Sequence, residues 1–254
     1  MGCLDSFSVK NVIGADYVQD TKIYQSFEAG VASQGLSVQH PAPETDFAFG
    51  SGKFTVLSPQ SISSNDNDNS VAIRLENGSN HFLFTGDAES AGEEAICNLG
   101  IDLSCDVIVP GHHGSATATT WNLLQQTVPE YAVISCRAGN SYGHPHKDTM
   151  DKLSDMGIQV FRTDEQGTII AVSDGNSIEW NQNPVMITHR EMNPIPVHSP
   201  LPFMMIPEVL PTDPSTHPIT IPRLLLRQKL KMWAIWSGSP LQEANITEFQ
   251  IVAI

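Results

Sequence analysis

Three short polar clusters in this chain carry side chains that can bind metal ions. They are Thr85-Gly86-Asp87, Gly111-His112-His113-Gly114-Ser115 and Gly143-His144-Pro145-His146, and each follows a short β-branched or aromatic run. Imidazoles and carboxylates are the usual ligands of a catalytic zinc, and a site with an open coordination position turns bound water into hydroxide near neutral pH. The clusters therefore favour metal-assisted hydrolysis, with Asp87, His112, His113 and His144 as candidate ligands.

Each cluster also has a simpler interpretation. Asp87 could cap the N-terminus of a helix that begins near Glu89. Histidines in loops, such as His144 and His146, are more often solvated than bound to a metal. The pair His112-His113 is harder to explain in this way, because adjacent imidazoles point to different sides and Gly114 leaves room beside them.

Ser115 has two chemical interpretations. As a nucleophile it would need activation, but no Gly-x-Ser-x-Gly elbow surrounds it, so contact with an oxyanion or a phosphate fits better. The histidines outside the three clusters occur in a strand-like run, in loops or in proline-rich sequence, and we expect no site role for them: His40, His81, His189, His198 and His217.

Strand and helix signals alternate along the chain, which favours a layered α/β sandwich. A polar run at 61–69 indicates a loop, and Asn77-Gly78 is a strong hairpin signal between two strands. We predict strands at 7–13, 53–57, 70–75, 81–84, 106–109, 131–135, 159–162 and 168–172, and helices at 22–34, 89–99, 117–126 and 147–156. The first two polar clusters come directly after the strands at 81–84 and 106–109, and the third lies in the segment after the strand at 131–135.

Composition limits the function classes. A chain of 254 residues with 40% hydrophobic content can build one large domain with an appendage. Its formal net charge of -15 argues against a broad basic face for phosphate backbones, so a nucleic-acid substrate would be held locally, by metal. The four cysteines form no Cys-x-x-Cys pair, which argues against a zinc ribbon.

The sequence shows neither a signal peptide nor a long apolar run, so we expect a soluble, cytoplasmic protein without a transmembrane segment. After Trp180 the character changes, since ten of the 17 prolines fall between Pro184 and Pro222. We therefore divide the chain into a domain at 1–180 and a proline-rich tail at 181–254. Residues 223–236 could form a basic amphipathic helix that packs on the domain, on a second copy or on a membrane surface.

Several segments occur in an order that closely resembles the metallo-β-lactamase-fold domain of ComEC-type competence proteins and their soluble relatives. The resemblance covers about residues 7 to 180 and is carried by Asn67-Asp68-Asn69-Ser70, Phe84 to Ala88 with Glu94, Val109 to Ser115, Val133 to Ser135 with Asn140 to Pro145, and Arg162 to Asp164 with Gly167.

This resemblance implies a four-layer αββα sandwich and a hydrolase with one or two zinc ions, for which the phosphodiesters of DNA are the usual suggested substrate. Asp87 looks like the carboxylate that bridges two metals, and the histidine of the His-His-Gly-Ser motif, His112, looks like a terminal ligand. The loop of His144 would line the pocket from the opposite side, and His144 or Ser115 would contact developing negative charge.

One family signature, His-x-His-x-Asp-His, has no counterpart in this chain. The sandwich is therefore expected to be incomplete at its N-terminus, with uncovered faces that favour a homo-oligomer. Two hypotheses remain open. The chain is a metal-dependent hydrolase whose site is completed from elsewhere, or it is a catalytically inactive remnant that serves as a binding or interaction domain.

Overall fold

A computed structural model describes residues 4, 7–50, 52–187 and 249–253 of the chain. The predicted helix at 223–236 and most of the proline-rich tail lie outside these residues. Everything below concerns the described part.

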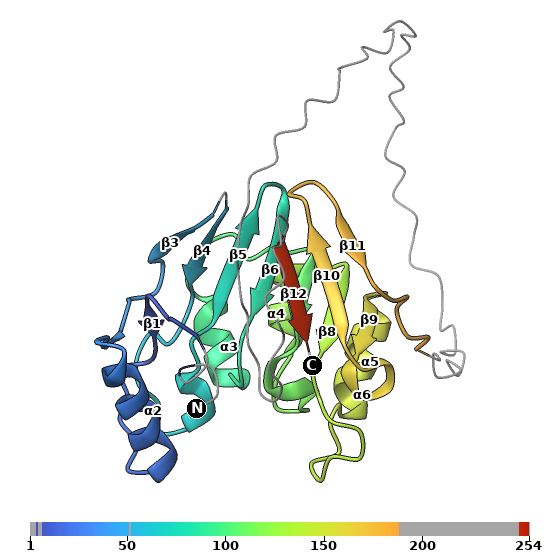
Figure 1. Cartoon of the computed structure of the whole chain (residues 1–254). Helices are drawn as coiled ribbons and strands as arrows, with labels where there is room; N and C mark the ends of the chain where they lie inside the picture. The colour runs from blue at the N-terminus through green and yellow to red at the C-terminus, as the bar shows by residue number, and fades with distance from the viewer. Residues whose placement is uncertain (1–3, 5–6, 51, 188–248, 254) are drawn as a thin grey trace, which may run out of the picture.

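The largest element is a seven-stranded mixed sheet with the order β3-β4-β5-β6-β7-β8-β9 (Figure 1). Pairing is antiparallel from β3 to β6 and parallel from β6 to β9. The strands are β3 (Asp46–Phe49), β4 (Gly52–Val56), β5 (Ile73–Asn77), β6 (Asn80–Phe84), β7 (Val107–Val109), β8 (Tyr131–Ile134) and β9 (Gln159–Arg162).

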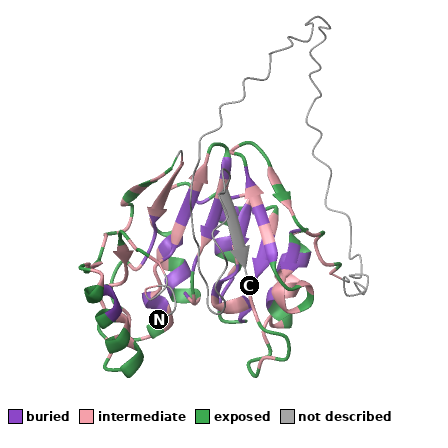
Figure 2. Ribbon diagram, in the orientation of Figure 1, coloured by how far each residue is buried: buried purple, intermediate pink, exposed green. Residues whose placement is uncertain are grey.

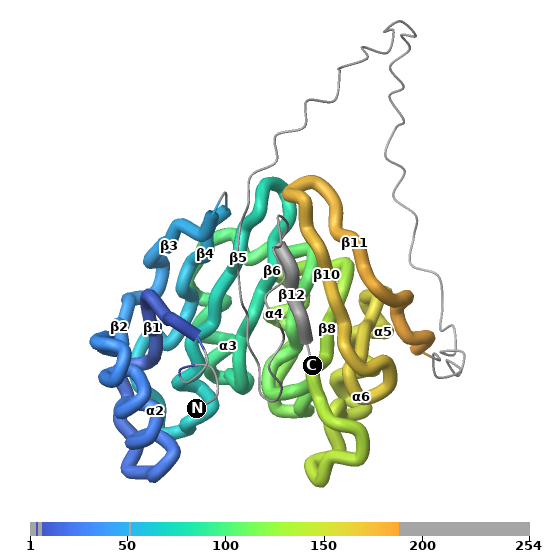
Figure 3. Tube along the Cα trace, viewed as in Figure 1, coloured from blue at the N-terminus to red at the C-terminus, as the bar shows by residue number. Residues whose placement is uncertain are grey.

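Two smaller sheets complete the β structure. A three-stranded sheet has the order β11-β10-β12, in which β10 (Ile169–Ser173) pairs antiparallel with β11 (Ile178–Trp180) and with β12 (Phe249–Ala253). β1 (Val12–Ile13) and β2 (Val38–Gln39) form a short parallel pair beside α2 (Figure 3).

Five helices and two 3-10 turns connect the strands. They are α2 (Lys22–Ser33), α3 (Ser90–Cys97), α4 (Trp121–Thr127), α5 (Lys147–Asp155), α6 (Thr163–Gln166), η1 (Asp66–Asn69) and η2 (Gly111–Gly114). In Figure 1, α3 and α4 lie behind the large sheet, while β10, β11 and β12 lie in front of it.

The large sheet has an apolar core on each face. On one face Leu83 and Ile108 belong to a cluster with Ile96, Leu123 and Leu153 of the helices. On the other face, neighbouring strand residues meet β10 in a second cluster of Leu75, Phe82, Val107, Val133, Phe161, Ile169 and Ala171. Figure 2 shows this burial along the central strands. Because both faces are covered, these strands read as continuous apolar runs rather than alternating ones.

The α/β class predicted from the sequence is confirmed, as are two facing sheets with helices on the far side of the larger one. The predicted hairpin is also confirmed, with Asn77 paired to Asn80 across Gly78 and Ser79. Gly78 has φ +60, and a Cβ there would lie 2.2 Å from the carbonyl oxygen of Gly175, so the turn requires glycine.

Some local expectations were wrong. The strand expected at 7–13 is reduced to Val12–Ile13, and the loop expected at 61–69 contains the 3-10 turn η1. Among the described residues after 180, those of β12 pair with β10 and Val185 forms a bridge with Val160. Within the described ranges, no helix combines the length and the apolarity needed to cross a bilayer.

The topology explains why the polar clusters meet. β6, β7 and β8 are parallel neighbours, so the segments that follow them leave the sheet at the same edge. Asp87 follows β6, His112 and His113 follow β7, and His144 lies in the loop after β8. One edge of the sheet therefore carries all three clusters.

Candidate functional site

The imidazoles of three histidines gather at this edge. The ring centroid of His144 lies 5.5 Å from that of His112 and 6.3 Å from that of His113, and the rings of His112 and His113 are 6.4 Å apart. The structure therefore brings together the histidines that the sequence predicts for the site.

His112 and His113 both have a left-handed backbone. Their φ/ψ values are 49/45 and 58/26, whereas non-glycine residues seldom adopt positive φ. Two such residues in a row are costly, on the order of 1–2 kcal/mol each. The neighbouring glycines allow close packing, since a Cβ on Gly114 would lie 2.8 Å from Pro145 Cβ and one on Gly111 would lie 2.9 Å from the oxygen of Ala88. The strained turn is thus held firmly in place.

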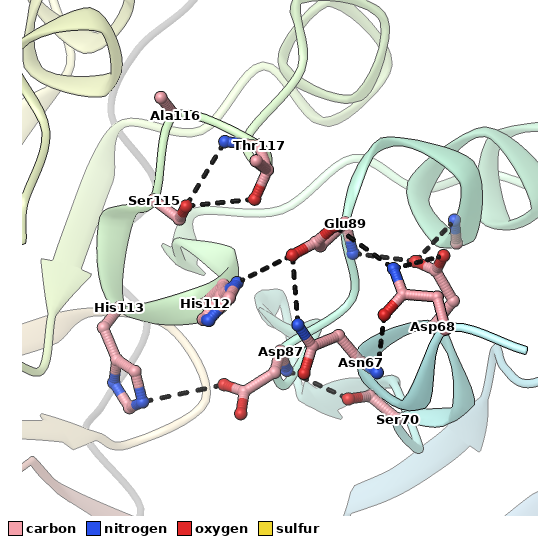
Figure 4. A network of polar contacts seen from close by, with 12 residues as sticks. Asn67, Asp68, Ser70, Asp87, Glu89, His112, His113, Ser115, Ala116 and Thr117 are labelled. Atoms are coloured by element: carbon pink, nitrogen blue, oxygen red, sulfur yellow. Dashed lines mark hydrogen bonds and ion pairs between the residues drawn. The ribbon is translucent and has the colours of Figure 1, made fainter. Parts of the chain in front are cut away.

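The carboxylate of Asp87 faces the ring of His113. Asp87 Oδ1 lies 3.6 Å from His113 Nε2 (Figure 4). His113 Nδ1 donates to the carbonyl oxygen of Ser135 at 2.8 Å, so the neutral ring carries its lone pair on Nε2. Ligands of a tetrahedral zinc, each about 2.1 Å from the ion, are roughly 3.4 Å apart, which is close to the observed spacing.

The ring of His112 turns toward a different carboxylate. His112 Nδ1 lies 3.2 Å from Glu89 Oε1. Asn67 and Asn65 donate their side-chain amides to the two oxygens of Glu89, at 3.0 and 3.1 Å. Burial acts to raise the pKa of Glu89, but these hydrogen bonds and the nearby His112 lower it overall. The sequence analysis assigned Asp87 and His112 to the same metal site. In the structure, the ring that lies opposite Asp87 is that of His113.

His144 closes the group from the loop after β8. The side-chain oxygen of Asn140 accepts from the N–H of His144 at 3.0 Å, and the amide of Asn140 donates to its carbonyl oxygen at 2.6 Å. Burial and the neighbouring histidines lower the pKa of His144. The lowered pKa favours the neutral imidazole, which is the form that binds a metal ion. The exposed ring of Tyr142 stacks on it, with centroids 5.7 Å apart.

His146 fastens two loops together. Its Nδ1 accepts from the N–H of Ala116 at 2.9 Å, and its Nε2 contacts the carbonyl oxygen of Tyr142 at 3.0 Å. Because Nδ1 accepts a hydrogen bond and a carbonyl oxygen can only accept, the proton lies on Nε2. His146 thus positions the loop of His144 against the loop of Ser115.

Ser115 does not join the histidine group. It is buried, and its hydroxyl contacts the hydroxyl of Thr117 at 3.0 Å and accepts from the N–H of Thr117 at 3.3 Å. Its carbonyl oxygen accepts from the hydroxyl of Thr149 at 2.9 Å. These contacts support the fold of the loop.

The helix after Asp87 is capped by another residue. Asp68 Oδ1 accepts from the N–H groups of Glu89 and Gly92, at 2.9 and 3.1 Å. A Cβ on Gly92 would lie 2.8 Å from that oxygen, so glycine permits this approach. The capping interpretation of Asp87 is therefore wrong, because the cap of α3 comes from Asp68.

Hydrogen bonds with the side chains of Glu93 and Lys152 fix the loop that follows the two histidines. The carboxylate of Glu93, which is fully buried, accepts from the N–H groups of Thr119 and Thr120. Lys152 donates to the carbonyl oxygen of Ala118 at 3.0 Å. The loop from Ser115 to Thr120 is thereby held against α3 and α5.

The donor set fits a metal ion only in part. Asp87 and His113 have the chemistry and spacing for a shared cation, and His112 and His144 border them. Among the described residues, however, no three or more His, Cys, Asp and Glu side chains are arranged to hold a metal ion.

Sequence reasoning gave no site role to Glu89, Glu93 or Asn65, and it quoted Asn67 only as part of the motif Asn67-Asp68-Asn69-Ser70. A weak signal existed for one part of this network. The run from Asn65 to Asn69 alternates Asn and Asp, a composition typical of turns and caps. Nothing in the sequence indicated that these side chains would reach Glu89.

Comparisons with known proteins give partial matches. No family profile matches the chain. Over 118 residues it is 37% identical to ComE operon protein 3 of Bacillus subtilis (strain 168), covering 46% of this chain and 15% of that protein. It is 37% identical over 105 residues to Competence protein ComA of Neisseria gonorrhoeae, covering 41% and 15%.

A third relative is Recombination protein 2 of Haemophilus influenzae, with 39% identity over 102 residues that cover 39% of this chain and 13% of that protein. The chain thus spans about 15% or less of the length of these three relatives. Among solved structures, the CmlA beta-hydroxylase E377D mutant aligns with a TM-score of 0.41 and 10% identity, over 60% of this chain and 38% of that one.

Proposed function

We propose that this chain is a metal-dependent hydrolase domain of the competence-protein type, acting on phosphodiesters. The pairing of Asp87 with His113 carries the proposal. The carboxylate oxygen and the imidazole nitrogen are 3.6 Å apart, and the bond from His113 to Ser135 fixes the tautomer that leaves the lone pair toward Asp87. Carbonyl bonds of this kind orient metal-binding histidines in proteins.

In this proposal Asp87 and His113 would hold a zinc ion, with His112 and His144 beside it. A bound zinc would supply a water of lowered pKa and polarise a phosphoryl oxygen. The protein groups orient and desolvate the substrate. Burial and the neighbouring histidines lower the pKa of His144, which favours the neutral ring that can donate a hydrogen bond to a phosphoryl oxygen.

The names of the relatives and the net charge support this substrate class. Two of them are named competence protein or ComE operon protein, and a third is named recombination protein. These names favour nucleic acid, while the net charge of -15 argues against binding through a broad basic surface. The edge of the sheet that carries His112, His113 and His144 is called the histidine edge below. A phosphodiester held at this edge reconciles both observations.

The test combines metal content with hydrolysis of bis-p-nitrophenyl phosphate and of DNA. Asp87→Ala should lose stoichiometric zinc and at least about 100-fold in rate, because it removes a ligand. His81→Ala is the matched control, since His81 lies on β6 and contacts Asp106 instead. Equal zinc content and equal rates in the two variants would refute the assignment.

A second candidate is a binding domain without catalysis. It is favoured by the lack of a set of three ligands among the described residues. Purified protein then contains almost no zinc after dialysis, and it hydrolyses neither substrate. Stoichiometric zinc excludes this candidate.

A further inference from the structure

Glu89 is the least expected residue at the histidine edge. Its backbone N–H is held by Asp68, and its carboxylate receives the side-chain amides of Asn65 and Asn67. Figure 4 shows this carboxylate between the side chain of Asn67 and the ring of His112. Glu89 also begins α3 as its N-cap residue, although its side chain makes no capping bond. The carboxylate is therefore fixed in place by these hydrogen bonds and does not cap the helix.

The contact between the Glu89 carboxylate and His112 indicates the role of this carboxylate. His112 Nδ1 is buried, and within the described part of the chain it has no well-aligned hydrogen bond. Glu89 Oε1 nevertheless lies 3.2 Å away, within ion-pair distance. A carboxylate oxygen is only an acceptor when ionised, so a lone pair on Nδ1 would be repelled there and a proton on Nδ1 is attracted.

We propose that Glu89 is a positioning residue, which holds the proton of His112 on Nδ1 and so leaves Nε2 as the ring nitrogen that serves the site. This inference rests on the proposed hydrolase site for its purpose, but the tautomer itself can be measured without metal. Glu89 acts only through His112 and touches no reacting atom.

The two adjacent histidines then have different partners. The Nδ1 proton of His113 goes to a neutral carbonyl, that of Ser135, whereas the Nδ1 proton of His112 faces an ionised carboxylate. A carboxylate makes an imidazole more basic and a stronger donor to a cation. The amides of Asn65 and Asn67 donate to this carboxylate and hold it beside His112, which is why they matter to a ring that they do not touch.

The first experiment measures the tautomer by long-range ¹H–¹⁵N NMR on the full chain, without metal, at a pH where imidazoles are neutral. In the natural protein we expect Nδ1 of His112 to appear as the protonated nitrogen. In Glu89→Ala the ring should shift toward the Nε2–H form that free histidine prefers. Glu94→Ala removes an exposed carboxylate from the same helix and should change nothing.

Glu89→Gln gives a rescue, because its side-chain oxygen can still accept from Nδ1. We expect it to keep the natural tautomer, which a purely structural role would not predict. If Glu89→Ala does not fold, Glu89→Met keeps the side-chain length without an acceptor and replaces it. An Nε2–H tautomer in the natural protein, or an unchanged tautomer in Glu89→Ala or Glu89→Met, overturns the inference.

The second experiment titrates zinc into the same proteins by competition with a chelating dye. Loss of the orienting carboxylate should weaken binding about 10–100-fold, the usual effect of removing such a partner. If the natural protein binds no zinc but its tautomer depends on Glu89, the positioning role stands and the hydrolase proposal fails. If zinc binds equally well with and without Glu89, the hydrolase proposal survives and the role of Glu89 in it is overturned.

Discussion

The buried carboxylate of Glu93 accepts a hydrogen bond from the backbone N–H of Thr119 at 2.6 Å, and a second one from Thr120 at 2.7 Å. These bonds join α3 to the loop that follows the two histidines. Glu93→Ala leaves both N–H groups without an acceptor, so we expect the free energy of unfolding to fall by about 3 kcal/mol. Urea denaturation measures this. A loss within about 0.5 kcal/mol, as we expect for Glu94→Ala on the exposed side of α3, would contradict it.

The same residue predicts a pH dependence. Burial raises the pKa of Glu93 above its ordinary value of 4.5, against the hydrogen bonds that lower it. The folded state therefore holds this proton more tightly than the unfolded state does, and the resulting stability is present below pH 4.5 and lost as the pH rises through the raised pKa. The difference in unfolding free energy between the natural protein and Glu93→Gln should decrease over that range. A difference that is constant with pH would contradict the shift.

The cap of α3 depends on Asp68. Asp68→Ala removes the acceptor for the N–H groups of Glu89 and Gly92, and we expect a loss of about 1–2 kcal/mol in unfolding free energy. Gly92→Ala should also destabilise, because its Cβ would approach Asp68 Oδ1 to 2.8 Å. In Asp68→Ala that obstacle is gone, so adding Gly92→Ala should cost less than it does alone. Strictly additive losses in thermal or urea unfolding would argue against this coupling.

His146 predicts a local change in dynamics. Its Nδ1 accepts from the N–H of Ala116, so His146→Ala should speed hydrogen exchange at Ala116 while the exchange of β6 and β7 amides stays unchanged. Hydrolytic activity should fall as well, because the loop that carries His144 loses its attachment. His81→Ala serves as the control. Unchanged protection of Ala116 would show that the two loops are held together by other contacts.

The described cysteines should react slowly. Burial raises the pKa of Cys97 to about 11 and that of Cys105 to about 12, and burial together with Asp164 raises the pKa of Cys136 to about 12. Since only the thiolate attacks, reaction with Ellman's reagent at pH 8 should be more than about 100-fold slower than for a free thiol. A Cys3→Ser background removes the remaining thiol.

Cys136 gives the sharper measurement because it is only partly buried. Asp164→Asn removes a negative charge beside its sulfur and should make Cys136 react faster, while Cys97 and Cys105 keep their rates. Equal rates before and after the substitution would show that burial alone controls this thiol.

Much of the fold could be predicted from the sequence, because β6 to β9 are short apolar runs separated by clear helix signals. Buried positions on both faces, such as Phe82 and Leu83, make these runs unmistakable. β3 was missed because Asp46–Phe49 is a short segment of half-buried and exposed residues. The strand at 7–13 was overestimated, since a β-branched composition cannot show whether a partner strand is available.

The proximity of the candidate residues could be predicted from the sequence, but their pairing could not. The sequence placed Asp87, His112, His113 and His144 at one sheet edge, which parallel strand order makes predictable. Which imidazole meets which carboxylate depends on the left-handed backbone of His112 and His113, and no periodicity encodes that. Glu89 escaped notice because its partners, Asn65 and Asn67, lie more than twenty residues away in a loop.

The left-handed backbone of His112 and His113 has a consequence for the stability of the protein. Glycine would adopt the conformation of His112 or His113 at no steric expense. A variant with glycine at both positions should therefore be more stable, but it would lack both imidazoles. The turn after β7 thus carries backbone strain at two positions, and both positions present an imidazole at the same edge of the sheet.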